Sequence, residues 1–164
     1  MKCQPHIIML IALSISCTNA FTQEKPLILT RAQAVEDFKW LRFALEYCHP
    51  RLYKYDDKQT VDARFDSLNN LIGPEISGLD FLNLVCAMNA SVRCGHLYTI
   101  PQGELAKQVL VKKVMPFYIK LMGDKFYLLN NCSNNDKVPN GSLILSINGK
   151  SSKEILAAIL PIIA

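Results

Sequence analysis

The sequence lacks most of the features that identify a function directly. It contains no CxxC pair, no internal repeat, no low-complexity segment and no Gly-x-Ser-x-Gly turn of the kind that presents a catalytic serine. Its 18 Lys and Arg only slightly outnumber its 14 Asp and Glu, and these charges are spread along the chain. We therefore expect no nucleic-acid partner. Half of the 164 residues are apolar, which is enough for the core of about one folded domain.

Residues 1–20 have the parts of a secretory signal peptide, with a positive start, the apolar run 7–13 and small residues that end at Ala20. The apolar run is too short to span a membrane. We therefore expect an exported protein, periplasmic or extracellular, with a linker over residues 21–29. The alternative is an outer-surface lipoprotein anchored through Cys17, which is the one membrane attachment we expect.

The other cysteines leave several interpretations open. In an oxidising compartment Cys48, Cys86, Cys94 and Cys132 could form disulfides in any of three pairings. Equally, they could be four buried free thiols. Cysteine and histidine occur close together at Cys48-His49 and at Cys94 and His96, which would suit a zinc site or a thiol nucleophile. Because the spacing fits no zinc-finger pattern, we assign no metal ligand and no cofactor.

Hydrophobic spacing predicts an α+β fold in two parts. Residues 30–101 form the first part, a helical N-terminal domain whose first helix begins with a capping box at Thr30 and Gln33. Residues 102–164 form a β-rich segment with a C-terminal helix, in which Gly123-Asp124 joins two strands of a hairpin. The predicted helices cover about 30–48, 58–72, 77–93 and 153–160, and the predicted strands are 116–121, 125–129 and 142–147.

Two groups of apolar side chains carry further expectations. The first group should pack in the core and between helices rather than form a ligand cage; it comprises Trp40, Phe43, Tyr47, Tyr53 and Tyr55. The second group makes the C-terminal helix strongly apolar; it comprises Ile155, Leu156, Ile159 and Leu160. We expect a downstream domain or a second subunit to cover that helix, so that the β-rich segment is incomplete by itself.

Three stretches carry a family resemblance. Residues 140–150, NGSLILSINGK, resemble the PDZ signature, in which a GD-x-I-L-x-I-N-G run precedes a helix. Residues 91–101 resemble the R-D-G-H-T element that ends the helical domain of carboxy-terminal-processing (tail-specific) serine peptidases, although Cys94 replaces the usual Asp. Residues 45–53 resemble the L-E-x-x-H-P-x-L-Y motif of secreted bacterial members. The family-like structural positions are Arg93, Gly95, His96, Asn148 and Gly149.

This resemblance implies that the chain is the N-terminal, non-catalytic portion of an exported tail-specific peptidase. Family members carry the catalytic serine and lysine in a later domain, so no residue here is assigned a catalytic role. A PDZ-like segment binds an extended polypeptide by adding it as a strand to a sheet edge. We expect the docking strand at Pro116, Phe117, Tyr118 and Ile119. The alternative is a stand-alone secreted interaction module that dimerises through its apolar C-terminal helix.

Overall fold

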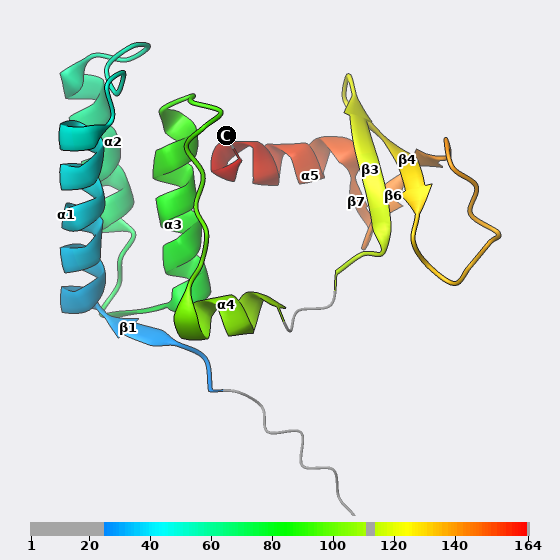
Figure 1. Ribbon diagram of the computed structural model, residues 1–164, viewed down its shortest axis with the longest axis horizontal. Coiled ribbons are helices and arrows are strands. Elements are labelled where there is room, and N and C mark those ends of the chain that lie inside the picture. Colours follow the sequence, from blue (N-terminus) through cyan, green and yellow to red (C-terminus); the bar gives the residue numbers. More distant parts are fainter. Residues whose placement is uncertain (1–24, 111–113, 164) are drawn as a thin grey trace, which may run out of the picture.

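The computed structural model describes residues 25–110 and 114–163. The predicted signal peptide and Cys17 lie outside these residues. The α+β fold class is confirmed, since the chain combines helices with small antiparallel sheets and a helix follows the last strand (Figure 1). The helices are α1 (Arg31–Cys48), α2 (Lys58–Asn70), α3 (Gly78–Ser91), α4 (Gly103–Leu110) and α5 (Ser152–Ile159), with a 3-10 turn η1 (Leu160–Ile162). The strands are β1 (Ile28–Thr30), β2 (Glu75–Ser77), β3 (Phe117–Met122), β4 (Lys125–Asn131), β5 (Leu143–Ile144), β6 (Ser146–Ile147) and β7 (Lys150–Ser151).

The first three helices form a bundle with one apolar core. The capping box at Thr30 begins α1, and the side chain of Ser77 accepts the N–H of Asp80 at the start of α3. Phe38 is 3% exposed, and its ring lies edge-on to Phe65, with centroids 5.6 Å apart. Met88 of α3 completes the centre of this core. The three predicted helices are therefore confirmed, and their apolar positions explain how they pack.

Strands β1 and β2 and helix α4 were not predicted from the sequence. Strand β1 lies in the expected linker and pairs with β2, so that Leu29 faces Ile76. Helix α4 lies within the segment expected to be β-rich. Its Leu105 closely approaches Gly78, where a Cβ would stand 3.1 Å from Leu105 Cδ1. Glycine at that position therefore leaves space for α4 to pack against the start of α3.

The second part is built on the predicted hairpin, with Gly123-Asp124 as its turn. Strands β3 and β4 pair antiparallel with a register shift between Tyr118 and Ile119, and β5 adds to β4. The predicted single strand 142–147 is wrong in detail. It divides at Leu145 into β5, which pairs with β4, and β6, which pairs with β7.

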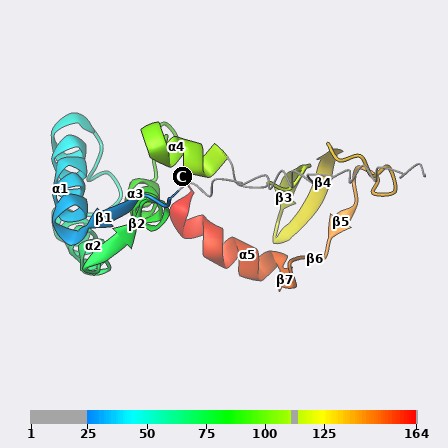
Figure 2. The ribbon, with the colours of Figure 1, turned by 90° about the horizontal axis from the view of Figure 1, so that it is seen from below.

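Helix α5 connects the second part to the bundle. A capping box between Ser151 and Glu154 begins it, and Leu156 is buried together with Phe126 and Leu128 of β4. Figures 1 and 2 show α5 running from β7 back toward α3, and η1 contacts α3. The chain itself therefore covers part of the apolar surface for which we expected an external partner, while Leu160 stays exposed.

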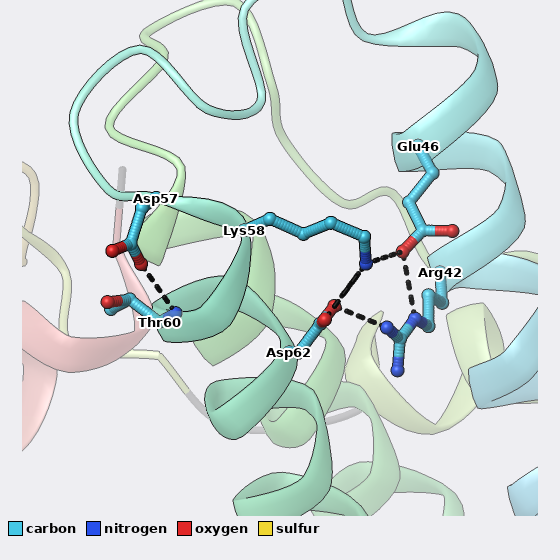
Figure 3. A network of polar contacts seen from close by, with 6 residues as sticks. All are labelled: Arg42, Glu46, Asp57, Lys58, Thr60 and Asp62. Atoms are coloured by element: carbon cyan, nitrogen blue, oxygen red, sulfur yellow. Dashed lines mark hydrogen bonds and ion pairs between the residues drawn. The ribbon is translucent and has the colours of Figure 1, made fainter.

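A network of ion pairs joins the polar sides of α1 and α2 (Figure 3). Arg42 donates through Nε to Glu46 at 2.9 Å and also contacts Asp62, which accepts from Lys58 Nζ at 2.8 Å. The Lys58 ammonium is the main cause that holds the pKa of Asp62 below its ordinary value. At the start of α2, Asp57 accepts the N–H of Thr60 at 2.8 Å. Acidic and basic side chains therefore alternate on this surface.

The predicted burial of the aromatic group is wrong. Five side chains expected in the core are exposed; they are Trp40, Phe43, Tyr47, Tyr53 and Tyr55. The first three form a row along α1, in which the rings of Phe43 and Tyr47 are stacked 5.6 Å apart. The core instead uses Phe38, which lies on the opposite side of the same helix.

For the cysteines, the free-thiol interpretation agrees with the structure, but the expected burial is wrong. All four cysteines in the described residues are free. Cys48 and Cys132 are exposed, whereas Cys86 and Cys94 are half-buried. Cys48 is the last residue of α1, and its side chain is exposed there.

Candidate functional site

Three of the four residues expected in the docking strand lie in β3, and the fourth immediately precedes it. The carbonyl of Pro116 accepts the N–H of Cys132 at 2.9 Å, which fixes the beginning of β3 against the end of β4. Phe117, Tyr118 and Ile119 follow within the strand. The structure therefore places this predicted group together, at one margin of the three-stranded sheet.

Strand β3 is the edge of that sheet. Its order is β3-β4-β5, so within the described residues β3 pairs on one side only. At an edge, every second residue directs its backbone N–H and C=O away from the neighbouring strand. Exposed apolar side chains accompany these groups, with Tyr118 66% exposed and Met122 56% exposed. An extended chain could pair with this edge and cover both side chains.

The opposite edge of the sheet, formed by β5, is much shorter than the β3 edge. Strand β5 has only two residues, and the chain leaves it at Leu145 to form β6. The β4 side of β5 is occupied, since Phe126 faces Ile144 and Tyr127 faces Leu143. With six residues, β3 presents the longer unpaired edge and is the better docking surface.

The family-like residues near residue 95 line a pocket. Arg93, Gly95 and His96 lie in the segment after α3, and they face the loop that joins α1 to α2. We call the space between these two segments the interloop pocket; its volume is about 450 Å³. His49 and Pro50, from the second family-like stretch, line its other side. Two of the three stretches that carry the resemblance therefore meet at one place.

An aromatic ring and a carboxylate hold the Arg93 side chain. Its guanidinium donates through Nη2 to Asp56 Oδ1 at 2.8 Å and lies over the Tyr55 ring, 4.8 Å from the centroid. Arg64 donates to the second oxygen of Asp56 at 3.1 Å. The hydrogen bonds from Arg64 and then Arg93 are the main causes that hold the pKa of Asp56 below its ordinary value. The Arg93 side chain is therefore preorganised beside the pocket.

The backbone of Arg93 is unusual. Its φ is +56°, in the left-handed region, at the position after the C-cap of α3 where glycine is the common residue. Gly95, two residues later, has no such requirement, and a Cβ there would meet nothing within 4 Å. The chain thus carries an arginine where glycine would be conformationally easier.

The remaining family-like pair lies elsewhere. Asn148 and Gly149 have φ of +51° and +79°, and they form the two-residue turn between β6 and β7. Positive φ at both positions is what a type I′ turn requires, and Asn-Gly is a common sequence for such a turn. Neither residue lines the interloop pocket. Their role is to position the start of α5.

The pocket also contains residues that the sequence analysis did not single out as a site. Lys54 and Tyr55 line it, and the ammonium of Lys54 stands 4.6 Å from the centre of the Tyr55 ring. Lys54, and to a smaller extent Arg93, lower the pKa of Tyr55. No local pattern in the sequence indicated that this segment faces residues 92–97.

The metal alternative finds no support in this arrangement. Among residues 25–110 and 114–163, no group of three or more His, Cys, Asp and Glu side chains could hold a metal ion. Within the same residues, no helix has both the length and the apolar character needed to cross a membrane.

Comparison with known proteins adds no relative. No protein-family model matches the chain, and no curated protein or solved structure matches it.

Proposed function

We propose that this chain binds an extended polypeptide at the free edge of β3. The observation that carries the proposal is the position of β3 at the end of the β3-β4-β5 order, with exposed apolar side chains beside the unpaired backbone. Binding would add a fourth strand, whose main-chain hydrogen bonds supply affinity while alternate side chains supply selectivity.

The packing of the hairpin supports this proposal. Phe126 and Leu128 of β4 are buried and anchor the sheet, whereas β3 contributes no fully buried side chain. Ile119 and Leu121 face the same side of the sheet as these anchors, since they pair with Leu128 and Phe126. They are 36% and 43% exposed, so this face of β3 is only partly covered. A bound strand would extend the buried layer beyond β3.

In this proposal the chain is the substrate-binding, non-catalytic portion of an exported tail-specific serine peptidase. The three sequence motifs support that assignment, and the fold provides a helical part followed by a small β-rich part in the same order. Peptide hydrolysis would then require the serine and lysine of a further domain. The alternative, a module that dimerises through its C-terminal helix, is favoured by the exposure of Leu160 and Ile163, which lie just after α5.

The test uses a matched pair of substitutions on exposed apolar residues. Tyr118→Lys places a charge on the β3 edge, and Leu145→Lys places the same charge between β5 and β6, where the side chain is 76% exposed. Binding of fluorescein-labelled ten-residue peptides with free carboxyl ends is measured by anisotropy. We expect Tyr118→Lys to weaken binding about tenfold and Leu145→Lys to leave it unchanged.

Two results would contradict the proposal. One is equal binding by both variants and the original chain, which would locate the peptide elsewhere. The other is equal binding of a peptide whose alternate backbone nitrogens are methylated, since that peptide cannot form the strand hydrogen bonds. Light scattering during size-exclusion chromatography tests the alternative function. A module that dimerises through its C-terminal helix elutes as a stable dimer, and Leu160→Lys converts that dimer to a monomer.

A further inference from the structure

The interloop pocket has a composition that the proposed function does not use. Five side chains that can carry positive charge line it: His49, Arg51, Lys54, Arg93 and His96. No carboxylate lines it, and the neighbouring Asp56 is already engaged by two arginines. Within the described residues, neither Arg51 nor Lys54 forms an ion pair with a carboxylate.

Helix ends oppose this positive charge only in part. His49 is the C-cap of α1 and Val92 is the C-cap of α3, so two helix C-termini adjoin the pocket. Each C-terminus carries about half a negative charge, or about one charge together. Arg51, Lys54 and Arg93 supply three positive charges, and Arg64 neutralises Asp56. The pocket therefore keeps a positive excess of about two charges and favours an anion.

The hydrogen-bond donors of the pocket also favour a negatively charged ligand. The Arg93 guanidinium uses one nitrogen on Asp56 and has further N–H groups to donate. His49 Nδ1 accepts the backbone N–H of Arg51 at 3.4 Å, which leaves Nε2 of that ring as a donor. Because Arg93 is fixed by Asp56 and Tyr55, it loses little side-chain freedom when a ligand binds.

The rest of the lining is apolar. Pro50, Val92 and Leu97 contribute to the wall, and Val92 and Leu97 also belong to or pack against the helical core. A volume of about 450 Å³ lies in the range of pockets that bind small organic molecules. A bare inorganic ion would leave this apolar wall in contact with water, whereas an organic acid would cover it.

We propose that the interloop pocket binds a small organic acid, with a carboxylate at one end and an apolar body. The carboxylate lies against Arg93, Arg51 and Lys54, and the apolar body of the ligand contacts Val92 and Leu97. None of the pocket residues lies in β3. The proposal for the pocket can therefore be tested independently of strand addition at β3.

The experiment titrates the full chain with hexanoate and with its uncharged amide, hexanamide. Imidazole signals of His49 and His96 report on the pocket itself by nuclear magnetic resonance, and the sequence has only three histidines to resolve. We expect saturable shifts of both signals with hexanoate, and at least about tenfold weaker binding of hexanamide because the charge-assisted hydrogen bonds are lost. A tetrapeptide with a free carboxyl end and its amidated form make the second pair.

A charge-matched pair of double variants supplies the control. R51Q/K54Q removes two positive charges from the exposed rim of the pocket, and K150Q/K153Q removes two exposed charges from β7 and α5. We expect R51Q/K54Q to weaken hexanoate binding about tenfold and K150Q/K153Q to leave it within about twofold. Circular dichroism confirms that both variants are folded.

The outcomes separate cleanly. Tighter binding of hexanoate than of the tetrapeptide acid supports a small acid as the ligand, whereas tighter binding of the tetrapeptide acid would overturn that assignment. The proposal is overturned if neither acid gives saturable shifts up to about 10 mM. It is also overturned if the amides bind as well as the acids, or if both double variants behave alike.

Discussion

Phe38 and Phe43 are the same residue type on one helix, five positions apart, and they should respond very differently to truncation. Phe38 is 3% exposed and contacts Phe65 and Phe81 edge-on, whereas Phe43 is 55% exposed and contacts only the rings of its own helix. Phe38→Ala removes a core side chain and leaves a cavity, which costs about 3–5 kcal/mol. Phe43→Ala loses exposed ring contacts, worth about 1 kcal/mol or less.

Urea denaturation followed by circular dichroism measures both free energies of unfolding. We expect Phe38→Ala to lower the midpoint strongly, or to abolish folding of the bundle, while Phe43→Ala unfolds close to the original chain. The conservative Phe38→Leu variant keeps enough volume to give a measurable transition. Similar losses for Phe38→Leu and Phe43→Leu would refute the register of α1 described above, because they would require Phe43 to be buried.

The remaining predictions concern turns, caps and acid stability. Gly149→Ala should cost about 1 kcal/mol because φ there is +79°, and Gly95→Ala should be neutral because its Cβ meets nothing within 4 Å; thermal melting compares the two. Ser151→Ala should cost about 1 kcal/mol in urea denaturation by removing the α5 capping box, and an unchanged free energy of unfolding would contradict this. The pKa of Asp62 is held below its ordinary 3.8, so its contribution to stability is complete above that pH and is lost as pH falls through the lower folded value. The melting temperature should therefore fall between about pH 5 and about pH 2, and by less in Asp62→Asn; an equal fall in both would exclude this contribution.

The helical part was predictable because local signals and the global fold agree there. Thr30 caps α1 in the capping box predicted with Gln33, and α1, α2 and α3 lie in the ranges that the hydrophobic spacing predicted. The exposed aromatic row was predicted wrongly from residue type alone. At about 100° per residue, Trp40, Phe43 and Tyr47 lie about 200°, 140° and 180° around the axis from Phe38, which places them on the opposite face. At these positions the angle around the helix axis, and not the hydrophobicity of the side chain, determines which residues are buried.

In the β-rich part, hydrophobic periodicity could not predict which strands pair. The run 142–147 has strand character throughout, yet the chain changes its partner at Leu145, and only the positions of β4 and β7 determine that change. Helix α4 was missed because it is short and begins at Gly103, whose φ is +56°.

The candidate site was predictable only in part. An apolar strand after Pro116 indicated β3, but its place at the sheet edge depends on β5 pairing with β4 rather than with β3. The interloop pocket joins residues about 40 positions apart, such as His49 and Arg93. Such contacts depend on how α1 and α3 end beside one another, which no local pattern encodes.

Hydrogen exchange across β3 tests the central claim most directly. The full chain is exchanged with and without a saturating ten-residue peptide, and then with the same peptide methylated at alternate backbone nitrogens. We predict that the unmodified peptide slows exchange of alternate amides between Phe117 and Met122, while the methylated peptide does not. Protection confined to other segments, or equal protection by both peptides, would contradict strand addition at β3.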